Sequence, residues 1–403
     1  MVGVLILTDK AKERGGKDIY DGKKNFGINK IIAQLDDDHE YCSPRTMDNY
    51  EHVIYSITSY YDILNLAKAV SPDKKCKLHV GGPGVNNIRS LLPIIDTAWF
   101  GRLDSREING ILAGQEFEAL WRKEKDPYFE GPYCVKATSR AGLGYEGEVE
   151  TSVGCRQKCK FCHYSFWNKY VCDNEESYKS GYTHYEDFFQ AVDWSRGRVI
   201  TALDGMTEKT RKLVAKPLPY QLIKEKLLES NSMPVREKNL TAKIYSIIGF
   251  PWEEEDEIDK CDITRALKEL DGQLKQPILF YFHLSHFVPM QKTPLWNARF
   301  NFANYWKKAR ETPLLFGTDT IKLYTGTSTT SPASAAVETF IQRADNGDYK
   351  SLKIFASKKW GRLSTTERVR FLKKDFVAKF VEQEHEKIAN IKTPYKYTAS
   401  SDV

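Results

Sequence analysis

The sequence predicts an α/β protein: a doubly wound parallel sheet at the N-terminus, then a partial (β/α) barrel, then a helical C-terminal region. Three observations support this order. Short apolar runs alternate with segments of helical spacing over residues 1–130, the alternation resumes over residues 131–324, and a stretch rich in Ser, Thr and Ala opens residues 325–403. These three ranges are the expected domains, and two prolines and a glycine mark a linker at residues 124–133.

Four apolar runs in the first domain are short, rich in β-branched or aromatic residues, and bounded by polar residues, Gly or Pro. They span residues 3–7, 52–58, 77–83 and 97–101, with helical spacing between them at 29–35 and 62–70. Such alternation predicts parallel strands joined by crossover helices. Gly81, Gly82 and Gly84 follow the third run, where the backbone either makes a plain strand-ending turn or approaches a ligand.

The second domain repeats the pattern with longer runs. Strands are expected at 197–205, 241–250 and 276–288, and helices at 207–215, 219–230 and 253–270. The repeats are too few for a full eightfold barrel, so a partial barrel is expected. In the C-terminal region, Ser331 and Pro332 suit a helix start, and "STTE" at 364–367 fits the capping box of a helix running to about Asn390.

The chain start bears on the cellular compartment. Its opening apolar run meets Asp9 and Lys10 too early for a membrane span, and it lacks the basic start of a signal peptide. We therefore expect a cytoplasmic protein (host cytoplasm if the chain is viral), with no membrane partner. Its eight cysteines are then expected to be reduced thiols, so a tight cysteine cluster favours a metal.

Such a cluster occurs in "CRQKCKFCHYSF", where Cys155, Cys159 and Cys162 fall within eight residues. Thiolates suit iron–sulfur clusters or zinc. A structural zinc site needs four protein ligands, which His163 or Cys172 could complete, but no second CxxC-like pair lies nearby. Three thiolates on a four-iron cluster instead leave one iron open to a cofactor or substrate. Iron–sulfur is the favoured interpretation over zinc and over unrelated structural thiols.

The segment "GCRQKCKFC", including Phe161 before the third cysteine, resembles the motif of the radical S-adenosylmethionine (SAM) superfamily. Segments 202–219, 245–256 and 286–296 resemble further elements of that superfamily, in the same order. The resemblance implies a 4Fe–4S cluster on Cys155, Cys159 and Cys162, with SAM bound to the open iron. An external reductant of the flavodoxin or ferredoxin type would supply an electron, and SAM would be cleaved to a 5′-deoxyadenosyl radical that abstracts hydrogen from the substrate.

The resemblance also implies the residues that contact SAM. These are Phe161, Asp204, Glu208, Gly249 and Pro251. An exposed helix start explains the two carboxylates equally well. In segment 245–256 Glu253 also matches, whereas Trp252 replaces a usual glycine. The "GGE"-like sequence that commonly contacts the SAM amino group does not occur between the cysteines and residue 198, so that contact has no assigned residue.

A doubly wound domain before such a barrel resembles the cobalamin-binding radical SAM enzymes. "VGGPGVNN" resembles their "GGPH" turn, and residues 99–112 resemble the segment that follows it. The Asp-x-His-x-x-Gly signature is missing, because Asp9 is followed by Lys10 and Ala11. No histidine is therefore expected as a lower axial ligand. If cobalamin binds, the resemblance implies contact with Gly81, Gly82 and Gly84.

The charge of the chain is concentrated near its end. Residues Lys350 to Lys379 hold ten Lys or Arg against two acids, a local net of +8 in a chain of net +6. Phe355, Trp360 and Phe371 interleave with these basic residues. The pattern fits a nucleic-acid partner, with cations for phosphates and rings for bases. It fits equally an amphipathic helix that packs its aromatics inward.

The favoured function is a radical SAM enzyme that rearranges or modifies a carbon centre, with a nucleotide or nucleic-acid base as preferred substrate, including the hypermodified bases of viral DNA. One alternative is a cobalamin-dependent radical SAM methyltransferase acting on a peptide or natural product. Another is a non-catalytic, zinc-stabilised nucleic-acid-binding protein. No catalytic hydrogen donor is assigned: Cys172 and Cys261 are expected to be structural as readily as functional.

Overall fold

A computed structural model provides the structure of the 403-residue chain. The residues that it describes are 1–7, 26–101, 103–129, 144–145, 148–149, 152–153, 157–162, 171–172, 193–216, 218–235, 238–254, 256–257, 259–291, 293–302, 321–323, 332–376 and 379. The chain forms two compact units. The first comprises Met1–Gly154, Trp167–Ser177 and Phe340–Ser364, and the second Cys155–Phe166, Tyr178–Thr339 and Thr365–Val403. The region after residue 339 is therefore divided between both units.

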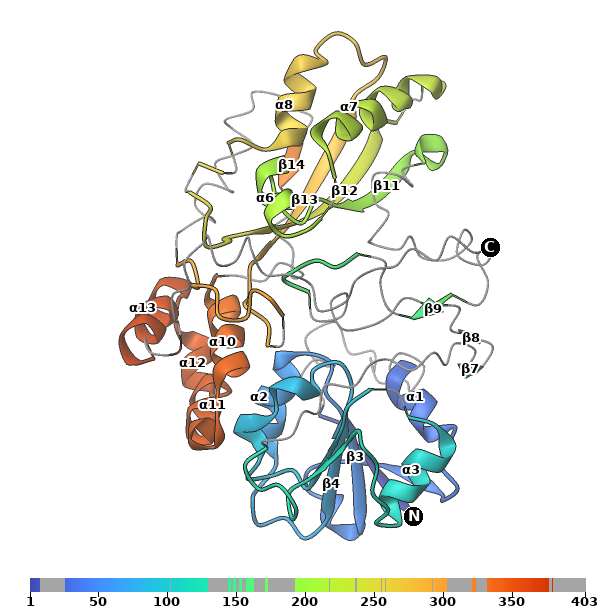
Figure 1. The fold of residues 1–403 in the computed structure, drawn as a ribbon, viewed down its shortest axis with the longest axis vertical. Coiled ribbons are helices and arrows are strands. Elements are labelled where there is room, and N and C mark those ends of the chain that lie inside the picture. Colours follow the sequence, from blue (N-terminus) through green and yellow to red (C-terminus); the bar gives the residue numbers. More distant parts are fainter. Residues whose placement is uncertain are drawn as a thin grey trace. The chain divides into compact units, whose positions relative to one another are not determined.

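The first unit contains a six-stranded sheet in the order β2-β1-β3-β4-β5-β6 (Figure 1). Its strands are β1 (Val2–Leu5), β2 (His39–Cys42), β3 (His52–Ser56), β4 (Lys77–Gly81), β5 (Thr97–Trp99) and β6 (Leu120–Arg122). All neighbouring pairs are parallel except β5 with β6. The expected mostly parallel α/β sheet is confirmed. The order β2-β1-β3-β4-β5 is a doubly wound order in which ligands bind beyond the carboxyl ends of the strands.

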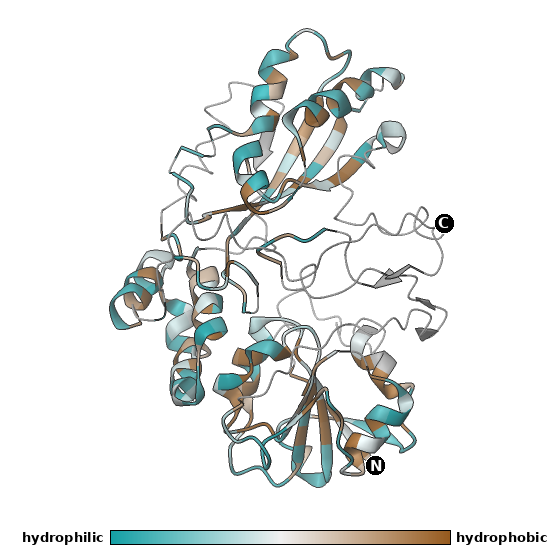
Figure 2. Ribbon diagram, viewed as in Figure 1, coloured by the Kyte–Doolittle hydropathy of each residue, from teal (hydrophilic) through white to brown (hydrophobic). Residues whose placement is uncertain are grey.

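Helices flank both faces of this sheet, with α1 and α3 on one side and α2 on the other (Figure 1). Their bounds are α1 (Phe26–Ile32), α2 (Tyr60–Ala69) and α3 (Ser105–Leu112). Ile28 and Ile32 of α1 pack against Val2, Val4 and Ile54 of the sheet. In Figure 2 the strands are hydrophobic along their middle parts and hydrophilic toward their ends, and α2 and α3 also carry both kinds of residue. This two-sided covering is the reason for the alternation seen in the sequence.

Two C-terminal helices complete the first unit: α11 (Tyr349–Phe355) and α12 (Lys358–Arg362). The hydroxyl of Tyr349 donates to the carbonyl of Val70, 3.2 Å away, at the end of α2. Phe355 is 3% exposed and Trp360 is 7% exposed, and their ring centroids are 4.9 Å apart. These two aromatics are therefore core residues that cannot offer their faces to bases.

The second unit contains a four-stranded parallel sheet in the order β11-β12-β13-β14. Its strands are β11 (Arg198–Ala202), β12 (Leu240–Ile248), β13 (Ile278–His286) and β14 (Ile321–Leu323), and its helices include α6 (Glu208–Leu213), α7 (Tyr220–Glu229), α8 (Asp262–Glu269) and α13 (Thr365–Asp375). Helix α10 (Pro332–Arg343) crosses the boundary between the units. The parallel strands at all three expected places are confirmed.

Some expected elements differ or fall outside the described residues. Helix α8 begins at Asp262 rather than near residue 253, because the residues before it form turns. Helix α13 begins at Thr365, as the capping box predicts, and ends at Asp375. Two short antiparallel pairs, β7 (Gly144–Tyr145) with β8 (Glu148–Val149) and β9 (Ser152–Val153) with β10 (Val171–Cys172), precede the sheet. A partial barrel stays a prediction, since most of residues 163–192 lies outside the described residues.

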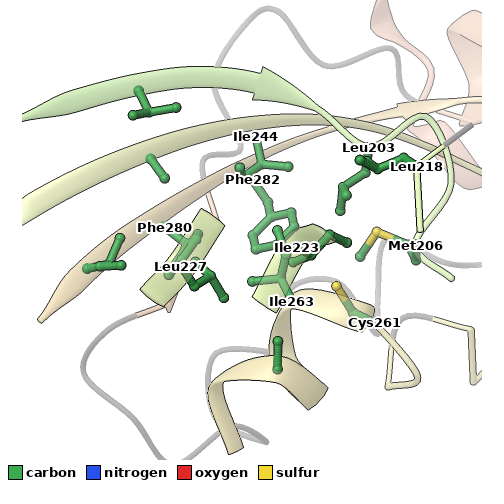
Figure 3. Packing of buried hydrophobic residues seen from close by; sticks show 14 of the residues in the cluster. Leu203, Met206, Leu218, Ile223, Leu227, Ile244, Cys261, Ile263, Phe280 and Phe282 are labelled. Carbon is green, nitrogen blue, oxygen red and sulfur yellow. The ribbon is translucent and has the colours of Figure 1, made fainter. Parts of the chain in front are cut away.

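One face of the second sheet forms the main core of its unit. Ile223 and Leu227 of α7 and Ile263 of α8 pack against Phe280 and Phe282 of β13 (Figure 3). Along β12 buried and half-buried residues alternate strictly, as a strand with one packed face requires. Each such aliphatic or aromatic side chain contributes about 1.5–3 kcal/mol when fully buried. The opposite face of these strands therefore lies outside this apolar core.

A buried arginine joins the loops at the carboxyl end of this sheet. The guanidinium of Arg211 on α6 is fully buried. It donates to the carbonyls of Gly205, Met206 and Leu218 at 2.9–3.3 Å and to the Asp262 carboxylate at 2.6 Å. A buried guanidinium is tolerated only when its charge and its donors have partners. Arg211 thus ties the loop after β11 to the start of α8.

Replacing Arg211 with Met is expected to lower the free energy of unfolding by about 3–5 kcal/mol, because it leaves the Asp262 carboxylate buried without its main cation. Urea denaturation followed by circular dichroism measures the change. The matched control is Lys260→Met, which removes an exposed pair with Asp256 (2.8 Å) and should leave the free energy of unfolding nearly unchanged, because exposed ion pairs contribute little. Equal losses in both variants would contradict the role of Arg211.

Candidate metal centre

The cysteine motif enters the second unit through residues 157–162. The amide of Lys160 donates to the carbonyl of Val214 (2.9 Å), and its carbonyl accepts from the amide of Leu295 (3.2 Å). Val214 follows α6, and Leu295 follows β13, so the motif is held by segments that leave the carboxyl end of the parallel sheet. That end is where α/β sheets bind ligands.

Two of the three expected ligands lie on one tight turn. The amide of Cys162 donates to the carbonyl of Cys159 at 3.1 Å, and Cys159 is buried while Cys162 is half-buried. Two cysteines at this spacing can ligate zinc or an iron–sulfur cluster through their thiolates. Within the described ranges no three His, Cys, Asp or Glu side chains are grouped so that they could hold a metal. Cys155 lies outside those ranges, so the complete ligand set stays a prediction.

The surroundings of Cys159 combine burial with a charged pair. Burial raises the pKa of the Cys159 thiol to about 12, while nearby Lys216 acts to lower it and Asp204 and Cys162 act to raise it. The Lys216 ammonium is buried and lies 2.9 Å from the Asp204 carboxylate. A thiolate here requires a positive charge beside it, which Lys216 and a metal ion can provide.

The two carboxylates expected near SAM differ in their roles. Asp204 lies next to the cysteine turn, with its backbone in the left-handed region (φ +50°) at the end of β11. Glu208 instead accepts from the amide of Tyr220 (2.8 Å) and pairs with Lys212 (2.6 Å). These bonds, chiefly that of Lys212, hold the pKa of Glu208 below its usual value. Glu208 thus has a local structural role, whereas Asp204 is part of the candidate site.

Phe161 connects the cysteine turn with the turn after β12. Its ring meets Phe250 edge to face, with centroids 5.9 Å apart, and it packs on the cluster formed by Val214, Phe250, Phe287, Leu295 and Ala298. Gly249 and Pro251 flank Phe250. Phe161 thus lies against the turn that contains Gly249 and Pro251, and the contact of these three residues with SAM stays a prediction.

Gly249 is required by its own surroundings. Its φ is +84°, and a Cβ there would lie 2.5 Å from Cε1 of the buried His286 imidazole. Next to it, the Glu253 carboxylate accepts from the amides of Gly249 (2.6 Å) and Phe250 (3.2 Å). Burial raises the pKa of Glu253 to about 8, and Glu257 raises it further, against the lowering effect of these two bonds. This turn is therefore held by a buried carboxyl group.

Two ionisable residues of the site, Lys216 and Glu253, are not among the site residues that the sequence predicts. Lys216 has no motif of its own, although it ends the run "RKLVAK" in a segment that already resembled the superfamily. Glu253 was noted as a match but not assigned a role. Neither its burial nor its bonds to Gly249 could be read from spacing, because they depend on how the loop folds back on the sheet.

Packing against Ile57 explains why glycines occur in the turn that follows β4. A Cβ on Gly82 (φ +99°) would lie 2.6 Å from the carbonyl oxygen of Ile57, and one on Gly84 would lie 2.8 Å from its Cγ2. The amide of Ile57 also donates to the carbonyl of Gly81 (2.8 Å). These contacts are what a strand-ending turn needs, and cobalamin contact by the three glycines stays a prediction.

Replacing Gly249 with Ala is expected to cost about 3 kcal/mol or more, because left-handed backbone strain adds to the clash with His286. Gly272→Ala is the matched control: φ there is +71°, but nothing lies within 4 Å of an added Cβ, so only about 1 kcal/mol of strain is expected. Denaturant unfolding compares the two. Similar costs would show that the His286 contact is not rigid.

Glu253 should make stability depend on pH. Its folded pKa of about 8 exceeds the unfolded value of 4.5, so the folded state holds the proton more tightly. The contribution is therefore largest below about pH 4.5 and is lost as pH rises through about 8. Relative to Glu253→Gln, the wild type should lose a few kcal/mol between these limits. The exposed Glu254→Gln is the control, and identical pH profiles for wild type and Glu253→Gln would contradict the assignment.

In the described part of the chain no helix is both long and apolar enough to cross a membrane. No protein-family model matches the chain, and a search of curated proteins finds no significant match. The motif and the geometry around Cys159 and Cys162 are therefore the basis for assigning a function.

Proposed function

We propose that this protein is a radical SAM enzyme that modifies a carbon centre of a nucleotide. Cys155, Cys159 and Cys162 would hold a 4Fe–4S cluster. One observation supports this most: the Cys159–Cys162 turn lies against segments that leave the carboxyl end of the parallel sheet, with the buried Lys216 and its half-buried partner Asp204 beside it. Because α/β sheets bind ligands at the carboxyl ends of their strands, a cofactor site is expected where the motif lies.

When bound, such a cluster supplies an open iron for SAM and passes on an electron from a flavodoxin- or ferredoxin-type reductant. The chain itself contributes binding and orientation. Lys216 offsets part of the negative charge of the thiolates. Phe161 and its apolar cluster exclude water from one side of the turn. Asp204 and the turn at Gly249 offer polar groups at the same edge of the sheet, where the amino and carboxyl groups of SAM need partners.

The alternatives require other features. A cobalamin-dependent methyltransferase needs cobalamin in the first unit; its strand order suits a ligand domain, but Gly82 and Gly84 already have a packing role against Ile57. A zinc-stabilised binding protein needs a fourth protein ligand. Of the two residues that could complete such a site, His163 lies outside the described residues and Cys172 ends β10. Metal analysis separates zinc from iron directly.

Anaerobically purified and reconstituted protein is expected to hold about four irons per chain and to absorb broadly near 400 nm. Cys159→Ala and Cys162→Ala should lose most of this iron and yield no 5′-deoxyadenosine with SAM and dithionite. Cys261→Ala is the control, since Cys261 is a buried cysteine of the same unit that precedes α8.

Three results would overturn the assignment. One is a colourless protein with stoichiometric zinc, and a second is SAM cleavage that persists in Cys159→Ala. The third is a fully loaded cluster in the wild type that forms no 5′-deoxyadenosine. Loss of iron in Cys261→Ala to the same degree as in Cys159→Ala would show that iron content reports folding rather than ligation.

A further inference from the structure

The face of β12 and β13 opposite α7 and α8 carries polar side chains. In the parallel register Lys243 pairs with Tyr281, and Tyr245 pairs with His283. Paired residues of neighbouring strands share a face, so these four lie together on the side away from the apolar core. Lys243, Tyr245 and Tyr281 are half-buried, and Ile200 of β11, paired with Lys243, is 38% exposed. Solvent therefore reaches this part of the sheet.

Three of these side chains form a contact chain. The Lys243 ammonium lies 4.8 Å from the ring centroid of Tyr245, and the Tyr245 ring lies 4.9 Å from that of His283. Among the described residues no carboxylate forms an ion pair with Lys243. Burial, and secondarily Lys243, lowers the pKa of His283 to about 4, so its imidazole is neutral at pH 7. The group then carries a single positive charge with hydroxyl and imidazole groups around it.

Such a group is unusual at this place in a fold. Inner strands of parallel sheets are normally apolar on both faces. Within the described ranges the Lys243 ammonium contacts an aromatic ring and no carboxylate, and its partial burial removes part of its solvation, which is costly. A bound anion would offset that cost. A phosphate suits the ammonium and the neighbouring N–H and O–H donors, and a flat base suits the faces of the aromatic rings.

We propose that Lys243, Tyr245 and His283 bind a free nucleotide, with Lys243 at its phosphate. The identification of that nucleotide as the substrate rests on the proposed function; the binding site does not. One cation fits one phosphate, whereas a polynucleotide requires a track of cations with accessible rings. Phe355 and Trp360 of the basic C-terminal segment are buried, which removes the two best candidates for such rings.

The test is calorimetric titration of the reconstituted protein, without SAM, with the four deoxynucleoside 5′-monophosphates and with the matching nucleosides. One monophosphate is expected to bind with a Kd of about 10–500 μM, and its nucleoside at least about tenfold more weakly. Lys243→Met should raise the Kd for the monophosphate at least about tenfold and leave the Kd for the nucleoside unchanged. Lys243→Arg, which keeps the charge, should restore most of the affinity.

The control is Lys224→Met in the same unit. Lys224 lies 5.9 Å from the Tyr220 ring and 2.8 Å from the Glu269 carboxylate, on α7 at the covered face of the sheet. This variant should bind the monophosphate as the wild type does. Thermal unfolding of each variant checks the fold, and the Arg variant keeps the test decisive if the Met variant does not fold.

Equal monophosphate affinity in the wild type and Lys243→Met would overturn the site. So would equal binding of monophosphate and nucleoside, or binding of a single-stranded oligonucleotide without any binding of monophosphates. Failure of the proposed function looks different. If nucleotide binding depends on Lys243 but the protein does not cleave SAM, the binding site stands and the radical SAM function is refuted. If the protein cleaves SAM but its nucleotide binding does not depend on Lys243, the function stands and the binding site is refuted.

Discussion

The second unit depends on one buried ion pair. Arg211 reaches the loop after β11, the segment after α6 and the first residue of α8, and Asp262 neutralises it. Because the guanidinium has no access to water, each of these backbone segments must stay within hydrogen-bond distance. The carbonyl of Val214, which receives the amide of Lys160, lies between two of the segments so held. The position of the cysteine turn thus follows from a charge that cannot be left unpaired.

The strands and the order of elements could be predicted from the sequence, because apolar runs of β-branched residues report burial directly. Strands β2, β6 and β14 of the two larger sheets and the short strands β7 to β10 were not predicted. β2 reads "HEYC" with three exposed residues, and β6 ends in Arg122, which is buried only because Glu116 and two carbonyls accept from it. Both are edge strands; β2 shows that such a strand can form with little apolar surface, whereas the three residues of β6 are all buried. The start of α8 was misplaced since acidic residues suit a helix start whether or not a helix follows.

The spacing of the cysteines in the candidate site could be predicted from the sequence, but the charged residues that surround them could not. Cys159 and Cys162 are neighbours in the sequence, so their spacing predicts their proximity. Lys216 comes near Cys159 only through the folding of the α6 segment, and Tyr245 meets His283 only through strand pairing. In the sequence, Lys243 is only a charged residue within an apolar strand pattern. Its neighbours can be identified only when the pairing of the strands is known. Phe355 and Trp360 fit an exposed and a packed arrangement equally well in the sequence, and the structure shows that both are packed in the core.

The division of the C-terminal segment between the two units affects how the protein is made. Residues 340–364 supply α11 and α12 to a unit whose sheet begins at Val2. During synthesis the end of α2 at Val70 therefore lacks its Tyr349 partner until residue 349 has left the ribosome. The first unit begins to form early and is completed late, while the strands of the second are already present. Long-range closure of this kind slows folding, and it makes the N-terminal sheet unsuited to independent expression as a simple N-terminal fragment.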